Sequence, residues 1–202
     1  LKWIDDNGDD GVFFDIGANV GIYSIYYAKT KKNNVYAFEP SFFNLSLLSK
    51  NINKNGVQDN IKIITNPLSD DMKFADFNLT NIDEGGALSA FGVNFNQDGN
   101  TLEKLLSYKT LGLTLDFLLA QKIIPEVPKM IKIDVDGIEH LILLGAKITL
   151  KNPICKTVLI EVNDKFKDQA LEVKNILIES GFSLDKKYHA VDETYNQIWS
   201  KD

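Results

Sequence analysis

Short apolar runs alternate along the chain with longer segments in which apolar residues recur every three or four positions. The short runs are typical of buried strands, and the periodic segments predict helices with one face on a core. Strands are expected at residues 12–16, 35–39, 61–64, 130–137 and 157–162, and a strand pair within 182–199. Helices are expected after Gly21, from the Ser41 N-cap to residue 55, and at 114–119, 139–144 and 165–179. This alternation predicts an α/β fold built on a doubly wound parallel sheet.

Two segments depart from this rhythm. Residues 1–11 are polar and acidic, and we expect a turn-like lead-in to the first strand. Residues 71–113 form an irregular insertion, in which 74–79 alternate like an edge strand and 83–89 form a glycine-bearing loop. Such an insertion serves more often as a lid or acceptor loop than as filler, and the alternative is a hairpin packed on the sheet edge. The candidate acceptor-contacting residues are Gly85, Gly86 and Ser89.

The turn after the first strand is the first candidate binding feature. The strand carries Asp15 near its end, and Gly17 and Gly21 follow, four positions apart, before the first periodic segment. A strand, a glycine turn and a helix together aim backbone N–H groups and a positive helix end at a ligand. Glycine is needed because a Cβ atom would block the tight turn and the close approach of the ligand.

Glu39 at the end of the second strand strengthens this prediction. It lies 18 residues beyond Gly21, close to the spacing at which an acidic residue meets the ribose in βαβ nucleotide folds. The alternative is a solvated glutamate before the turn at Pro40. Together with the glycine turn, Glu39 predicts a nucleoside site.

Acidic residues recur at or near the predicted strand ends: Asp15, Glu39, Asp70, Asp134 and Glu161. Ligands of open α/β sheets bind beyond the carboxyl ends of the strands, where the strand order reverses. Five acids beside one crevice favour a cationic or hydroxyl-rich ligand over a bare pyrophosphate. The sulfonium and amino groups of S-adenosylmethionine fit this charge pattern better than a dinucleotide does.

The amino-acid composition limits the kinds of partner that the protein is expected to bind. The 202 residues fit a single domain, with 44% hydrophobic and 25% charged residues, and no apolar run is long enough to span a membrane. The net charge is −6 and all 22 basic residues are lysines, which argues against a nucleic-acid partner. The single cysteine, Cys155, agrees with a reducing cytoplasm. The N-terminus is not a signal peptide, and because it starts at Leu1 we expect a piece of a longer protein.

The sequence resembles the FkbM family of S-adenosylmethionine-dependent methyltransferases. The resemblance rests on Phe14–Gly21 (FDIGANVG), Ala37–Pro40 (AFEP), Thr114–Asp116 (TLD), Ile131–Glu139 (IKIDVDGIE) and Gly145–Ala146, in the order that the family has. Asp136 departs from the pattern, since the family usually has glutamate there.

The resemblance implies a mostly parallel seven-stranded class I methyltransferase sheet, Rossmann-like, with an antiparallel terminal strand. It implies that residues 17–21 hold the methionine end of S-adenosylmethionine, that Glu39 holds the ribose, and that Ser69 and Asp70 lie near the adenine. The cofactor-binding residues are then Asp15, Gly17, Ala18, Asn19, Gly21, Glu39, Pro40, Ser69 and Asp70. Because family members mostly methylate hydroxyl groups of sugars and natural products, the implied reaction is O-methylation of a small-molecule acceptor such as a saccharide.

Transfer to a hydroxyl group benefits from a base or a metal ion that helps to remove the acceptor proton. Asp134 and Glu139 are the predicted catalytic residues. The alternative for Asp134 is a carboxylate that orients the cofactor or braces the loop, and the alternative for Glu139 is a first-turn acid that stabilises its helix. Asp134 could also share a metal ion with Glu161, Asn163 and Asp164 at the next strand end. The family resemblance does not require a metal, so we predict metal-independent catalysis.

Two other functions share part of this pattern. A nicotinamide-dependent (NAD) oxidoreductase would also use the first strand, the glycine turn and Glu39, but it leaves the block around Asp134 unexplained. A non-catalytic nucleoside-binding module would have the same fold but would catalyse no reaction. Binding of S-adenosylmethionine or NAD separates these alternatives.

Overall fold

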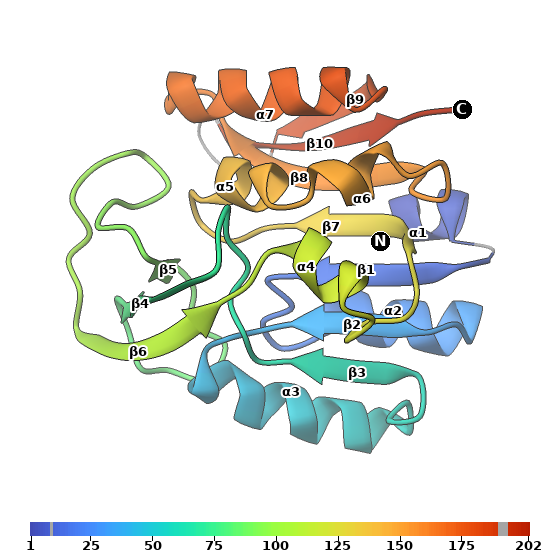
Figure 1. The fold of residues 1–202 in the computed structure, drawn as a ribbon. Helices are drawn as coiled ribbons and strands as arrows, with labels where there is room; N and C mark the ends of the chain where they lie inside the picture. Colours follow the sequence, from blue (N-terminus) through green and yellow to red (C-terminus); the bar gives the residue numbers. More distant parts are fainter. Residues whose placement is uncertain (9, 190–193) are drawn as a thin grey trace.

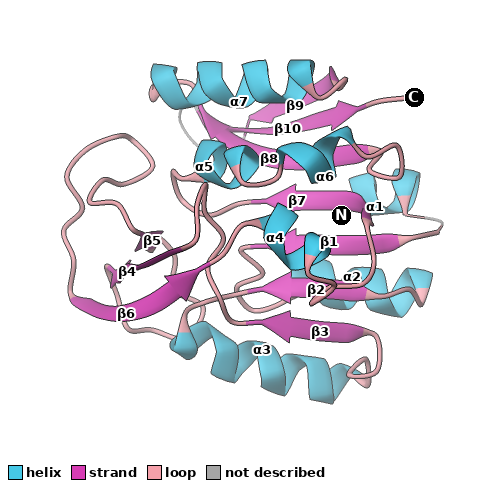
Figure 2. Cartoon of the chain, in the orientation of Figure 1, coloured by secondary structure: helices cyan, strands magenta, loops and turns pink. Residues whose placement is uncertain are grey.

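The computed structural model of the chain describes residues 1–8, 10–189 and 194–202. Its centre is a seven-stranded sheet in the order β3-β2-β1-β7-β8-β10-β9, with helices on both faces (Figures 1 and 2). The strands are β1 Val12–Ile16, β2 Val35–Phe38, β3 Ile61–Ile64, β7 Pro128–Ile133, β8 Thr157–Asn163, β9 Ser183–His189 and β10 Thr194–Ser200. The helices are α1 Lys2–Asn7, α2 Ile22–Lys31, α3 Phe42–Asn55, α4 Leu115–Ala120, α5 Glu139–Leu144, α6 Lys147–Lys151 and α7 Lys167–Glu179.

The strand directions confirm the predicted fold class. Strands β3, β2, β1, β7 and β8 pair in parallel, and β10 pairs antiparallel with both β8 and β9. The strand order reverses between β1 and β7, so a crevice opens beyond the carboxyl ends of these two strands. This crevice is the expected ligand position.

The core consists of two apolar layers, one on each face of the sheet. On one face Phe13 of β1 packs with Tyr27 of α2 and Leu48 of α3. On the other face Phe14 packs in a cluster that includes Ile142 of α5 and side chains of α4 and α7. Because helices cover both faces, the central strands are mostly apolar and read as short apolar runs in the sequence, interrupted by single polar residues such as Asp15, Lys132 and Glu161.

The first residues differ from the predicted turn-like lead-in. Residues Lys2–Asn7 form α1, and its Trp3 and Ile4 are buried against the sheet. The Trp3 indole N–H donates to Thr157 Oγ1 of β8 at 2.9 Å. The prediction was wrong because the acidic residues around these two apolar side chains hid a short amphipathic helix.

The insertion is more regular than predicted. β4 Lys73–Leu79, β5 Ala90–Phe91 and β6 Leu106–Gly112 form a second sheet in the order β5-β4-β6 with antiparallel pairing. Figure 1 shows this small sheet beyond the carboxyl ends of the central strands. A strand at 74–79 is confirmed, but β4 lies between β5 and β6 and is not an edge strand. Its partner β6 lies almost thirty residues later, which local patterning cannot detect.

Across the part of the chain that the structure describes, no helix combines the length and the apolar character needed to cross a membrane.

Candidate functional site

A cavity lies at the carboxyl ends of β1, β2 and β7. Its walls come from stretches that are far apart in sequence and meet only in the fold. The polar and turn-forming lining residues are Gly17, Asn19, Glu39, Pro40, Asn44, Asn66, Pro67, Gly86, Ser89, Asp134 and Asp136, and the apolar ones include Phe38, Leu68, Phe77, Phe91 and Ile138. The lining therefore combines apolar side chains with three carboxylates, those of Glu39, Asp134 and Asp136.

The glycine turn shapes one wall. Gly17 has φ +78° and Asn19 has φ +49°, and Gly21, with φ +90°, begins α2 as its N-cap. A Cβ atom on Gly17 would lie 1.9 Å from the backbone oxygen of Asp134. The N–H groups of Gly17 and Ala18 donate to the Phe38 oxygen at 3.0 Å each. The turn therefore needs glycine at residue 17 to fit between β2 and β7.

Glu39 lies directly beyond β2 and is tied to the glycine turn. Its Oε2 accepts the Asn19 N–H at 2.8 Å, and its Oε1 accepts the Ser41 N–H at 2.9 Å and the Asn44 amide at 3.4 Å. The residue is 5% exposed. Burial raises the pKa of Glu39, and these hydrogen bonds oppose that rise. The two strongest sequence signals thus meet at one cavity.

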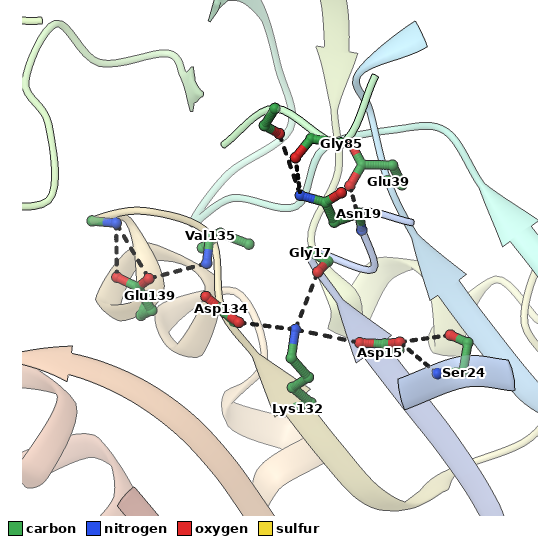
Figure 3. A network of polar contacts seen from close by, with 12 residues as sticks. Asp15, Gly17, Asn19, Ser24, Glu39, Gly85, Lys132, Asp134, Val135 and Glu139 are labelled. Carbon is green, nitrogen blue, oxygen red and sulfur yellow. Dashed lines mark hydrogen bonds and ion pairs between the residues drawn. The ribbon is translucent and has the colours of Figure 1, made fainter. Parts of the chain in front are cut away.

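Lys132 was not predicted from the sequence as part of the site. Its buried ammonium lies 3.2 Å from Asp134 Oδ2 and 3.5 Å from Asp15 Oδ1, and it donates to the Gly17 oxygen at 3.1 Å (Figure 3). Burial by itself lowers the pKa of Lys132, but the charges of Asp134 and Asp15 outweigh it, so the net pKa is raised. The only sequence signal was a lysine between Ile131 and Ile133 in a predicted strand.

Asp15 does not line the cavity. It is 1% exposed, and its Oδ2 accepts both the backbone N–H and the hydroxyl of Ser24, at 3.0 and 2.6 Å. It therefore connects β1 to the first turn of α2 and balances the charge of Lys132.

Of the two predicted catalytic acids, only Asp134 lines the cavity, with its side chain 40% exposed. Glu139 is 2% exposed, and Oε1 accepts the N–H groups of Val135 and Gly137 at 3.1 and 3.2 Å. Figure 3 shows Glu139 directed at the Val135 backbone and Asp134 directed at Lys132. Burial raises the pKa of Glu139 to about 8. Glu139 thus braces the loop that follows β7.

Ser69 and Asp70 also lie outside the lining. The Ser69 hydroxyl donates to Asp70 Oδ1 at 2.8 Å, and Asp70 pairs with Lys73 at 2.7 Å. The preceding residues 66–68 line the cavity in their place. Ser69 and Asp70 therefore lie next to the cavity, and the residues of this segment that contact it come just before them in the sequence.

A loop between β4 and β5, residues 80–89, closes over the cavity, and we call it the covering loop. The Asn19 amide donates to the oxygens of Gly85 and Gly86 at 3.3 Å each. Asn44 accepts the Gly85 N–H at 2.9 Å and donates to the Gly86 oxygen at 3.0 Å. The covering loop is therefore held by the glycine turn and by the start of α3.

Asp136 holds the other end of the covering loop. Its Oδ2 accepts the Leu88 N–H at 2.6 Å. Burial and then the charge of Asp134 raise the pKa of Asp136 to about 6. Of the predicted acceptor-contacting residues, Gly86 and Ser89 line the cavity. Gly85 helps to hold the covering loop in place through its hydrogen bonds with Asn44 and Asn19.

No group of three or more His, Cys, Asp or Glu side chains is arranged for a metal ion within residues 1–8, 10–189 and 194–202. The side chains that the metal alternative required after β8 have other partners. Asn163 donates to the Gln97 oxygen at 3.2 Å, and Asp164 pairs with Lys187 at 2.5 Å.

The strand order, the antiparallel β10 and the glycine turn facing an acid after β2 define a class I methyltransferase fold. The family profile of the methyltransferase FkbM domain matches residues 15–184. The chain belongs to this family, which confirms the resemblance seen in the motifs. A search of curated proteins by sequence gives no match.

Solved structures agree on the fold. Methyltransferase FkbM from Methylobacillus flagellatus KT superposes with a TM-score of 0.67 at 16% identity, over 95% of this chain and 44% of that one. A precorrin-6y C5,15-methyltransferase from Geobacter metallireducens GS-15 superposes with a TM-score of 0.55 at 13% identity, over 96% of this chain and 81% of that one. TrmK of M. capricolum, in complex with S-adenosyl-homocysteine, superposes with a TM-score of 0.52 at 13% identity, over 95% of this chain and 62% of that one. The chain thus spans less than half of the Methylobacillus protein.

Proposed function

We propose that the protein transfers a methyl group from S-adenosylmethionine to a hydroxyl oxygen of a small molecule. The observation that carries the proposal is the buried Glu39 carboxylate, which lines the cavity and is tied to the Asn19 backbone of the glycine turn. The FkbM family membership supports the reaction, and the S-adenosyl-homocysteine in the TrmK structure supports the cofactor.

The cavity residues suit the parts of this cofactor. Glu39 offers carboxylate oxygens to the two ribose hydroxyls, and Gly17 leaves room for close approach of the methionine end. Leu68, Phe77 and Phe91 provide an apolar wall for the adenine. Residues Ser69 and Asp70 then act by fixing this wall. When bound, S-adenosylmethionine supplies a methyl group on a sulfonium sulfur.

Asp134 is proposed to accept the proton of the acceptor hydroxyl, because it lines the cavity and is held by Lys132. Glu139 is proposed to position Asp134 through the backbone of residues 135–137. The acceptor enters beneath the covering loop, and a saccharide hydroxyl agrees with the family resemblance. Metal independence, a cytoplasmic location and the lack of a nucleic-acid partner stay predictions from the sequence.

Cofactor binding tests the proposal. S-adenosylmethionine and S-adenosyl-homocysteine should each raise the melting temperature, and NAD should not. Glu39→Ala should weaken S-adenosylmethionine binding by about 1–3 kcal/mol, because the ribose hydroxyls and the Asn19 N–H lose their acceptor. Isothermal calorimetry measures this, with the exposed Glu179→Ala of α7 as the control. Stabilisation by NAD in place of S-adenosylmethionine would favour an oxidoreductase.

The covering loop gives a second prediction. Asn44→Ala removes two hydrogen bonds to residues 85–86, so the amides of the covering loop should exchange hydrogen about tenfold faster or more. Added cofactor should slow exchange in the wild-type loop. Hydrogen-exchange mass spectrometry reads both effects, and Asn55→Ala at the far end of α3 is the control. Loop exchange that is slow without ligand and unchanged by cofactor would contradict a lid.

A further inference from the structure

The charges around the cavity do not balance. Glu39 follows β2, Asp134 and Asp136 follow β7, and all three line the cavity. None of the described residues in the lining carries a positive side chain. Lys132 lies outside the lining, and its ammonium is already paired with Asp134 at 3.2 Å and with Asp15 at 3.5 Å. The cavity therefore presents an excess of negative charge to a ligand.

Asp136 holds its carboxylate in a fixed place at the cavity wall. Its backbone has φ +62°, and its Oδ2 accepts the Leu88 N–H of the covering loop at 2.6 Å. The charge of Asp134 contributes, after burial, to the raised pKa of Asp136. The two carboxylates thus repel each other, and a positive charge in the cavity would relieve this repulsion.

The wall of residues 134–136 adjoins the glycine turn, since a Cβ atom on Gly17 would lie 1.9 Å from the Asp134 backbone oxygen. On the proposed function, Glu39 holds the ribose and the turn at Gly17 receives the methionine end. The cofactor sulfur joins these two parts and therefore lies beside the wall that carries Asp134 and Asp136. This sulfur is a positive sulfonium in S-adenosylmethionine and a neutral thioether in S-adenosyl-homocysteine.

We propose that Asp134 and Asp136 make the site selective for S-adenosylmethionine over S-adenosyl-homocysteine by attracting the sulfonium charge. The two ligands share the adenosine, the amino group and the carboxylate. Contacts with Glu39, with the apolar wall and with the glycine turn therefore cancel in the ratio of the two affinities. The charge and the methyl group remain, and attraction to a charge is stronger in a half-buried cavity than in water.

Methyl transfer removes this attraction. The bond between sulfur and the methyl carbon breaks with its electron pair left on sulfur, the bond between the acceptor oxygen and the methyl carbon forms, and the hydroxyl proton passes to Asp134. When Asp134 has released this proton to water, both carboxylates face a neutral sulfur. The product therefore binds more weakly than the cofactor, which promotes its release and limits product inhibition.

The test measures both affinities by calorimetry at pH 7.5, above the pKa of about 6 of Asp136. S-adenosylmethionine should bind wild-type protein about tenfold or more tightly than S-adenosyl-homocysteine. Asp136→Asn should weaken S-adenosylmethionine binding by about fivefold or more and change S-adenosyl-homocysteine binding by less than about twofold. Asparagine tolerates a positive φ, and its side-chain oxygen can accept the Leu88 N–H, so the variant should fold and keep the loop contact.

The matched control is Asp83→Asn, which removes the same charge from an exposed position of the covering loop outside the lining and should leave the ratio unchanged. Asp134→Asn should also lower the ratio. Sinefungin tests the charge without a variant, because a protonated amine replaces its sulfonium methyl group. It should bind wild-type protein more tightly than S-adenosyl-homocysteine does.

Three results would overturn the inference: equal affinity of wild-type protein for S-adenosylmethionine and S-adenosyl-homocysteine, equal weakening of both in Asp136→Asn, or sinefungin that binds no better than S-adenosyl-homocysteine. The second result would mean that Asp136 acts only by holding the covering loop. Each of them leaves the proposed function intact, because both ligands still bind. Failure of wild-type protein to bind either ligand would overturn the proposed function, and the selectivity with it.

Discussion

Replacing Lys132 with Met should lower the free energy of unfolding by about 3–5 kcal/mol, the cost of leaving a buried charge without its partner. Lys132 is the cation between Asp15 and Asp134, and Asp15 is 1% exposed. Methionine fills a similar volume but leaves the Asp15 carboxylate facing an apolar chain. Urea denaturation measures the loss, and Lys54→Met on the exposed face of α3 provides the control.

A second substitution tests the reason for this loss. Adding Asp15→Asn to the Lys132→Met variant removes the unpaired charge while keeping a group that can accept from Ser24. The double variant should therefore recover part of the lost stability. A loss below about 1 kcal/mol in the single variant, or a fully additive double variant, would show that the ion pair is not what stabilises this region.

Gly17→Ala should abolish measurable cofactor binding and lower stability by more than about 2 kcal/mol. The positive φ by itself costs an L-residue roughly 1–2 kcal/mol. The added Cβ would also lie 1.9 Å from the backbone oxygen of Asp134. Asp134 directly follows β7, and its N–H donates to the Ile16 oxygen of β1 at 3.1 Å, so its backbone is held in place. The chain must therefore rebuild the turn that forms the cavity wall.

The matched control is Gly56→Ala at the end of α3. Gly56 has φ +66°, but among the described residues no atom beyond its immediate chain neighbours lies within 4 Å of the position of its Cβ, so only the backbone strain of the positive φ applies. Denaturation and calorimetry should show a modest stability loss and unchanged cofactor binding for Gly56→Ala. Equal losses in the two variants would mean that the contact with Asp134 has no effect.

The glycine turn and Glu39 could be predicted because each is a local signal at a strand end. Lys132 could not be assigned, because its partners become visible only when the strands are paired. In the parallel register of β1 and β7, Asp15 and Lys132 are direct neighbours, although more than a hundred residues separate them. The small sheet escaped prediction for the same reason, since β4 and β6 pair across a long irregular segment.

The acids show a second limit of sequence reasoning. Strand-end position correctly suggested that Asp134 lies at the cavity, but it could not tell which way neighbouring carboxylates point. Glu139 turns back to the N–H groups of Val135 and Gly137, as an acid in a first helical turn can do when the preceding loop offers free donors. Asn44 was overlooked because its function depends on the covering loop, which approaches α3 only in the folded chain.

Asn19 belongs to the glycine turn through its backbone and to the covering loop through its side chain. A glycine at this position would satisfy φ +49° equally well but would have no amide to offer to the loop. The asparagine therefore makes the turn and the loop thermodynamically linked. Linkage is reciprocal, so any affinity that the closed loop adds for the cofactor is matched by an equal preference of the cofactor-bound protein for the closed loop.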